Sequence, residues 1–238
     1  MKVVLLAGGL GTRIMEETQV RPKPMVEVGG RPILHHIMET YAAQGFRQFA
    51  VALGYKGSFI KDYFEAHPTG WDIELVETGE RTMTGGRIQR MRELLQDGAF
   101  MVTYGDGVSD IDLHALLAFH RSHGRLATLT AVHPPQRATR MLLDEGGVRG
   151  FQHSSQGEGW INGGYFVFEP GVFDYLGGDD DTLEGVALSK LASDGQLMAY
   201  RHAGFWQCMD NVVERDLLEG MWAAGNAPWA ISRLPAMT

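Results

Sequence analysis

A short glycine-rich stretch near the start of the chain combines residue types that bind phosphate. Gly8, Gly9 and Gly11 lie within four positions, and Arg13 follows them closely. Glycines let backbone N–H groups approach phosphate oxygens without a Cβ in the way, and a turn of such groups forms an anion-binding nest. The stretch therefore predicts a site for a phosphorylated ligand, to which Arg13 adds a positive charge.

A second cation follows in a stiff segment. Lys23 stands between Pro22 and Pro24. Each proline fixes its own φ, so the lysine is presented by a backbone with little freedom. Arg13 and Lys23 together suit a ligand with several phosphates, such as a nucleoside triphosphate.

Two familiar phosphate-binding motifs do not fit this stretch. A P-loop ends in Gly-Lys-Ser or Gly-Lys-Thr, whereas this stretch has Gly11 followed by Thr12 and Arg13. A dinucleotide fingerprint needs a third glycine three positions after the second, and Ile14 stands there. A tight turn between a strand and a helix remains the alternative for the glycines alone.

The elements that must position these residues alternate along the first half of the chain. Apolar runs predict buried strands at 3–7, 49–53, 100–104 and 127–132, with a further strand at 72–76. Helical spacing separates them, as at 32–43, 57–64 and 88–96, and Ser109 is the predicted N-cap of a further helix. This alternation predicts an α/β fold with a mainly parallel sheet and helices on both faces. The glycine stretch follows the first strand, at the sheet edge where such folds bind ligands.

The second half of the chain has a different pattern. Short strands are expected at 141–143, 148–152 and 164–168, and helices return near 182–192 and 213–223. We therefore expect one domain over residues 1–238. About 1–135 forms its nucleotide-binding part, and about 136–238 forms a more antiparallel, sugar-phosphate-binding part.

Composition restricts the class of protein. The formal net charge of −8 disfavours non-specific nucleic-acid binding. No apolar stretch approaches the ~20 residues of a membrane span, and the apolar run at the N-terminus is too short for a signal peptide. Cys208 is the only cysteine, so no intrachain disulfide forms. A cytoplasmic protein is expected, with neither a nucleic acid nor a membrane as partner, and Cys208 is expected to be a packed side chain.

The stretch from Leu6 to Met25 resembles the signature of the sugar-nucleotide pyrophosphorylases, which are nucleoside-triphosphate:sugar-1-phosphate nucleotidyltransferases. The resemblance covers nearly the whole chain and is closest to the glucose-1-phosphate cytidylyltransferase branch. It includes the strings at 24–30, 54–57, 84–87, 103–108, 161–164 and 204–207. The strings Thr-Gly-Gly-Arg at 84–87 and Tyr-Gly-Asp-Gly-Val at 104–108 point to the cytidylyl branch.

The resemblance implies a Rossmann-like, GT-A-like fold and an Mg²⁺-dependent reaction. An NTP, CTP in the closest branch, donates its nucleotidyl group to a sugar 1-phosphate and releases pyrophosphate. Arg13, Lys23 and Asp106 are the implied catalytic residues, and Asp106 and Asp210 are the implied metal ligands. Asn162 and Gly163 match positions on the sugar side, and a homo-oligomer is expected. The implied nucleotide-binding residues are Leu6, Ala7, Gly8, Gly9, Leu10, Gly11, Thr12, Arg13, Lys23, Thr82, Gly85, Arg87 and Gly105.

Some of these residues have plain structural alternatives. Asp106 could be a turn aspartate, and Asp210 could cap the helix expected at Val213. Arg87 could be a surface residue at a helix start, and Asn162 could be a turn residue.

Two departures from the family pattern concern the sugar and the oligomer. Relatives carry Glu-Lys-Pro where this chain has His153-Ser154-Ser155, so the lysine that faces the sugar phosphate is missing. Arg137, Arg140, Lys190 or a protonated His153 could replace it. The segment between Phe64 and Ile73 is also shorter than in glucose cytidylyltransferases.

Three functions remain open from the sequence. The first is a cytidylyltransferase acting on a sugar 1-phosphate, and the second is the same chemistry with another NTP or another phosphorylated acceptor. The third is a regulatory subunit that binds a nucleotide sugar without turnover. The presence of Gly11, Arg13, Lys23, Asp106 and Asp210 together argues against the third, because an idle domain has no physical need for all five.

Overall fold

The computed structural model describes residues 1–9, 20–134, 140–144, 147–152 and 159–230, the third and fourth of these segments as backbone only. None of the helices described in these segments is both long and apolar enough to cross a membrane.

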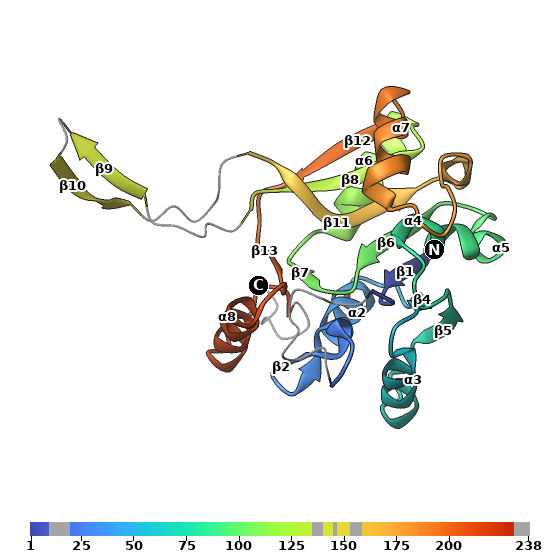
Figure 1. The fold of residues 1–238 in the computed structure, drawn as a ribbon, viewed down its shortest axis with the longest axis horizontal. Helices are drawn as coiled ribbons and strands as arrows, with labels where there is room; N and C mark the ends of the chain where they lie inside the picture. Colours follow the sequence, from blue (N-terminus) through green and yellow to red (C-terminus); the bar gives the residue numbers. More distant parts are fainter. Residues whose placement is uncertain (10–19, 135–139, 145–146, 153–158, 231–238) are drawn as a thin grey trace.

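Short strands and helices alternate through most of the described chain (Figure 1). The strands are β1 (Lys2–Leu6), β2 (Glu27–Val28), β3 (Arg31–Pro32), β4 (Gln48–Leu53), β5 (Asp72–Glu77), β6 (Phe100–Tyr104), β7 (Gly107–Ser109), β8 (Ala127–Val132), β9 (Arg140–Asp144), β10 (Gly147–Gln152), β11 (Ile161–Phe168), β12 (Leu197–His202) and β13 (Trp206–Cys208). The helices are η2 (Lys23–Met25), α2 (Ile33–Ala43), α3 (Gly57–Ala66), α4 (Thr84–Arg90), α5 (Arg92–Leu95), α6 (Leu113–His123), η3 (Pro170–Asp174), η4 (Leu183–Leu188), α7 (Ser189–Ser193) and α8 (Val212–Ala223).

One large sheet organises the molecule. Within the described residues it has seven strands in the order β12-β8-β11-β6-β1-β4-β5. β6, β1, β4 and β5 pair in parallel, and β12 pairs in parallel with β8. β11 runs antiparallel to both of its neighbours, β6 and β8. The expected mainly parallel sheet is confirmed, with β11 as its antiparallel member.

Helices cover both faces of this sheet, as the alternating pattern predicts. Successive side chains of a strand point to opposite faces. Val3 and Leu5 of β1 therefore belong to the core beneath α2, α3, α6 and α8, whereas Val4 and Leu6 belong to the core beneath α4, α5, η4 and α7. Because both faces are buried, the strands consist of continuous apolar runs.

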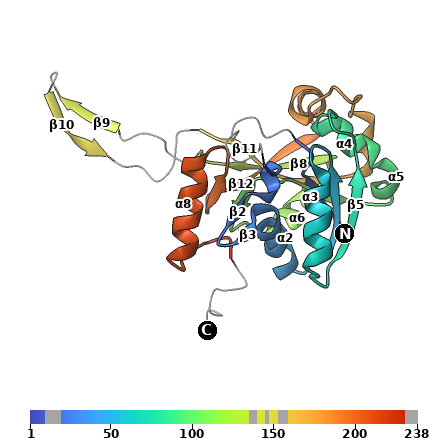
Figure 2. The ribbon, with the colours of Figure 1, turned by 60° about the horizontal axis from the view of Figure 1, so that its bottom comes forward.

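A hairpin of β9 and β10 projects from this body. The two strands pair only with each other and lie far from the large sheet in both views (Figures 1 and 2). The predicted antiparallel character of the second half is found in this hairpin, in β11 and in β13, which pairs antiparallel with β7.

Two local expectations need correction. The helix after β7 begins at Leu113, and its N-cap is Asp112, whose side chain accepts a hydrogen bond from the Ala115 N–H. Ser109 ends β7 instead, where its hydroxyl donates to the Phe205 carbonyl at 2.8 Å. The helix predicted at 88–96 is two helices, α4 and α5, and α4 begins earlier, at Thr84.

Candidate active site

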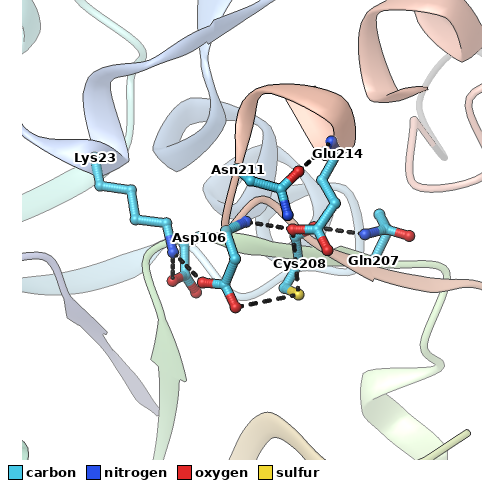
Figure 3. A network of polar contacts seen from close by, with 7 residues as sticks. Lys23, Asp106, Gln207, Cys208, Asn211 and Glu214 are labelled. Atoms are coloured by element: carbon cyan, nitrogen blue, oxygen red, sulfur yellow. Dashed lines mark hydrogen bonds and ion pairs between the residues drawn. The ribbon is translucent and has the colours of Figure 1, made fainter. Parts of the chain in front are cut away.

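One lysine and two carboxylates meet at the carboxyl edge of the sheet. The Lys23 ammonium donates to Asp106 Oδ2 and to Asp210 Oδ1, each at 2.6 Å (Figure 3). The lysine side chain is 10% exposed, and those of Asp106 and Asp210 are 30% and 18% exposed. Three residues from distant parts of the sequence thus form one partly buried cluster, and all three are sequence-predicted site residues.

A small antiparallel ladder brings the two carboxylates together. β7 pairs with β13 so that Gly107 lies opposite Cys208. Asp106 immediately precedes β7, and Asp210 follows β13 after one intervening residue. The Met209 N–H donates to the Asp106 carbonyl at 2.9 Å and extends the ladder to the aspartates themselves.

The proline-flanked segment sets the position of Lys23. Lys23–Met25 forms the short helix η2, preceded by Pro22 in an extended conformation. Pro24 lies against Gly105, where an added Cβ would come within 3.2 Å of the proline ring. Because Gly105 precedes Asp106 directly, this close packing holds the lysine beside its first carboxylate.

The electrostatics of the cluster favour a charged lysine. Burial disfavours the ammonium form, but the charges of Asp106 and Asp210 and their hydrogen bonds outweigh it. The pKa of Lys23 is therefore raised above its ordinary value, and the side chain is charged at neutral pH.

The start of α8 fixes the second carboxylate. Asn211 is the N-cap, and its side chain accepts from the Glu214 N–H at 2.9 Å. Glu214, which is 7% exposed, accepts from the Asp210 N–H at 2.6 Å (Figure 3). Capping by Asn211 removes the alternative that Asp210 serves as the cap. Sequence reasoning missed Glu214, although the spacing Asn-x-x-Glu before a helix is a capping-box signal.

Cys208 is a packed thiol in this site. Burial, followed by the charges of Glu214 and Asp210, raises its pKa to about 12. The thiol is therefore protonated at neutral pH, which excludes a nucleophilic role there. Its sulfur and the oxygens of Asp210 and Glu214 lie within 4.8 Å of one another.

The glycine stretch begins at the end of β1, as predicted. Leu6 ends the strand and Ala7 is fully buried. Gly8 is buried and accepts a hydrogen bond from the Tyr55 N–H at 3.1 Å, whereas Gly9 is exposed. Leu10, Gly11, Thr12 and Arg13 lie outside the described residues, so the predicted roles of these four remain predictions.

The other predicted nucleotide residues lie before and within α4. Thr82 is buried. The Gly85 N–H donates to the Asp181 carbonyl at 3.0 Å, so this glycine packs against the loop before η4. The guanidinium of Arg87 is buried and donates to protein acceptors, including the Gly8 carbonyl at 2.8 Å. Arg87 is not an exposed helix-start residue, and a direct contact with nucleotide remains a prediction.

The predicted sugar-side residues lie in an irregular part of β11. The Asn162 side chain accepts from the Gly164 N–H at 2.9 Å, next to a register shift in the pairing with β8. The Gly163 carbonyl accepts from the Trp206 indole at 2.7 Å. Asn162 therefore stabilises a local turn, and its amide NH₂ group can still donate to a ligand.

The structure also bears on the cation that could replace the missing lysine. Lys190 lines a separate cleft of about 810 Å³ together with Leu126, Tyr175 and Asp194. This cleft contains none of the predicted site residues, and the role of Lys190 stays a prediction. Arg137 and His153 lie outside the described residues, and nothing is described of the Arg140 side chain.

Comparison with known proteins identifies the family of the chain. Residues 2–207 match the nucleotidyl transferase family. The glucose-1-phosphate cytidylyltransferase of Salmonella typhi is 47% identical, over 96% of this chain and 98% of that protein. The probable glucose-1-phosphate cytidylyltransferase of Bacillus subtilis (strain 168) is 38% identical, over 97% of this chain and 100% of that protein.

Solved structures share the fold. HddC from Yersinia pseudotuberculosis superimposes with a TM-score of 0.75 and 25% identity, covering 93% of this chain and 99% of that one. The inositol-1-phosphate CTP transferase from T. maritima has a TM-score of 0.68 at 17% identity, covering 91% of this chain and 94% of that one. The second likeness concerns the fold alone.

Proposed function

Because this chain belongs to the nucleotidyl transferase family, we propose that it transfers CMP from CTP to glucose 1-phosphate. An oxygen of the sugar phosphate attacks the α-phosphorus of CTP, the bond from that phosphorus to the β-phosphate oxygen breaks, and pyrophosphate leaves. The attacking phosphate is already anionic, so the step needs charge neutralisation and alignment more than a general base. The observation that carries the proposal is the cluster of Lys23, Asp106 and Asp210 at the carboxyl edge of the sheet.

The two carboxylates of this cluster suit a divalent cation. Both place an oxygen 2.6 Å from one ammonium, which shows that they converge on a single positive charge. Carboxylate oxygens are the ligands that Mg²⁺ prefers, and we propose Mg²⁺ held by Asp106 and Asp210. When bound, the ion would neutralise negative charge on the phosphates of the nucleotide.

The residues around the end of β1 form the proposed nucleotide half of the site. Lys23 supplies a charge for the triphosphate, and the exposed Gly9 backbone lies at the edge where its phosphates would approach. The other residues of the proposed nucleotide site, whether they touch the nucleotide or position the groups that do, are Leu6, Ala7, Gly8, Leu10, Gly11, Thr12, Arg13, Thr82, Gly85, Arg87 and Gly105.

Three residues that lie side by side on neighbouring strands support a site for the sugar phosphate next to the nucleotide half of the site. Asn162 of β11 and Arg201 of β12 both lie opposite Ala131 of β8, so the three share one face. The Arg201 guanidinium lies 5.6 Å from the centre of the Trp160 ring. We propose that Arg201 supplies the positive charge for the sugar phosphate, in place of the family's missing lysine.

The Arg201→Met variant tests this acceptor role. The KM for glucose 1-phosphate should rise roughly tenfold, the loss expected for one charge-assisted contact, while the KM for CTP stays unchanged. The matched control is Arg125→Met, because Arg125 is also exposed but precedes β8 at its opposite end. An unchanged KM for glucose 1-phosphate in Arg201→Met would remove Arg201 from the acceptor site.

A pyrophosphate-release assay tests the whole assignment. The enzyme is given Mg²⁺, each of CTP, UTP, dTTP, GTP and ATP, and a panel of sugar 1-phosphates. The expected result is release with CTP and glucose 1-phosphate. Release with CTP and only another acceptor would retain the nucleotide and change the sugar. CTP binding without release for any pair would favour a regulatory subunit.

We also propose one functional domain, a homo-oligomer and a cytoplasmic location. The single domain is supported by the cluster itself, since Asp106 and Asp210 come from its two parts. The homo-oligomer is supported by the projecting β9–β10 hairpin, because two strands alone are marginally stable in water. A monomer in light scattering would contradict it. The reduced Cys208 suits the cytoplasm, and recovery of the enzyme from a secreted fraction would argue against that location.

A further inference from the structure

Arg87 ties together the ends of three neighbouring strands. Its side chain is 3% exposed. Nη1 donates to the Leu53 carbonyl at 2.9 Å, to Thr78 Oγ1 at 2.6 Å and to the Gly79 carbonyl at 2.8 Å. Nη2 donates to the Gly8 carbonyl at 2.8 Å. These acceptors end or follow β4, β5 and β1, so one guanidinium links their carboxyl ends.

The first two glycines of the stretch have different relations to this arginine. A Cβ added to Gly8 would lie 2.2 Å from Nη1 of Arg87 and 2.4 Å from Cζ. A Cβ added to Gly9 would meet no atom of the described residues within 4 Å. Gly8 is therefore required because the guanidinium passes directly against it, whereas no described residue imposes the same demand on Gly9.

The peptide bond between these two glycines lets the arginine contact fix the orientation of the Gly9 N–H. The carbonyl of Gly8 and the N–H of Gly9 belong to one planar trans peptide, so they point in opposite directions. The carbonyl points to the buried guanidinium and also accepts from the Tyr55 N–H at 3.1 Å. The Gly9 N–H is therefore turned away from Arg87.

The buried charge adds a second effect. Among the described residues, Arg87 forms no ion pair with a carboxylate, and its four hydrogen bonds of 2.9 Å or less go to three carbonyls and one hydroxyl. The nearby Asp179 is bound by Arg90 at 2.9 Å. An arginine remains protonated in proteins, and its field extends further in a low-dielectric surrounding. Arg87 therefore places a buried positive charge directly against Gly8.

We propose that Arg87 is a positioning residue for the nucleotide, which aims the Gly9 N–H at a phosphate oxygen of the NTP by holding the Gly8 carbonyl. This role rests on the proposed function, because it needs a triphosphate at the loop. In this proposal Gly8 is needed for its contact with Arg87, and Gly9 is needed to bind the phosphate. The glycine pattern in the sequence does not distinguish these two roles.

A double-mutant cycle between Gly8→Ala and Arg87→Ala tests the proposal. CTP affinity is measured by calorimetry and stability by urea unfolding. Gly8→Ala alone should weaken CTP binding roughly tenfold, the value of one hydrogen bond to a charged group, and lower the urea midpoint. In the Arg87→Ala background the same change should have little further effect, since the clashing group is gone. The matched control is Gly9→Ala, whose effect on the urea midpoint should be the same with and without Arg87.

Arg87→Lys keeps the charge but loses the fork, which covers the case that Arg87→Ala does not fold. It should raise the KM for CTP about tenfold and leave the KM for glucose 1-phosphate unchanged. A purely structural role would lower the active fraction without changing either KM. Additive losses in the Gly8–Arg87 cycle, or an unchanged KM for CTP in Arg87→Lys, would overturn the proposal. If the wild type binds another NTP and not CTP, the proposed nucleotide is wrong. The double-mutant cycle is then measured with the NTP that binds, and its result still tests the role of Arg87.

Discussion

Asp106→Asn is expected to abolish pyrophosphate release while leaving the protein folded. The substitution removes the negative charge but keeps the size of the side chain. The backbone carbonyl of Asp106, which accepts from the Met209 N–H, is unaffected. A catalytic metal supplies several kcal/mol of charge stabilisation, so losing one of its two proposed ligands should slow turnover roughly a thousandfold or more. Single-turnover rates over a range of Mg²⁺ concentrations measure this loss.

The control for this substitution is Asp97→Asn. Asp97 is exposed and precedes β6, the strand after which Asp106 comes, at the opposite end. Its replacement should leave both the rate and the Mg²⁺ dependence unchanged. Asp210→Asn should reproduce the defect of Asp106→Asn, because the two carboxylates act on the same cation. If Asp106→Asn turned over at a near-normal rate, its proposed metal role would be lost.

The main strands could be predicted because buried strands consist mainly of apolar residues. β1, β4, β6 and β8 are buried on both faces and consist of apolar runs, which glycines or polar residues end. β12 was missed because it lies at the edge of the sheet, half-exposed, and contains Arg201 and His202. Ser109 was misplaced because a serine before an apolar run suits both a strand end and a cap.

The site could be predicted only in part, because its residues meet through long-range pairing. Lys23 and Asp106 stood out by their prolines and glycines, but Asp210 was found through resemblance. The β7–β13 ladder that joins the aspartates is too short to have a sequence pattern of its own. The burial of Arg87 was also hidden, since an arginine on a short helix is exposed in most proteins. Only the tertiary structure shows that its closest acceptors are three backbone carbonyls and the Thr78 hydroxyl.

Lys23→Met is expected to slow catalysis and to strengthen metal binding at the same time. The ammonium stabilises charge on the phosphates in our proposal, so its loss should cost roughly 2–4 kcal/mol in the barrier, or about 30- to 1,000-fold in rate. The same ammonium bridges both proposed metal ligands at 2.6 Å. A cation bound there must therefore compete with the lysine, and removing the lysine removes the competitor.

Thermal unfolding separates these two effects. Without metal, Lys23→Met leaves Asp106 and Asp210 facing each other with no cation between them, so its midpoint should fall below that of the wild type. Added Mg²⁺ should then raise the midpoint more in the variant than in the wild type, because stabilisation by a ligand grows with its affinity. Lys61→Met is the control, since Lys61 forms an exposed pair with Glu77, and such pairs contribute little. If Mg²⁺ raised the unfolding midpoint equally in Lys23→Met and in the wild type, the lysine and the metal would not share the carboxylates. An unchanged rate of catalysis in Lys23→Met would exclude Lys23 from the chemical step.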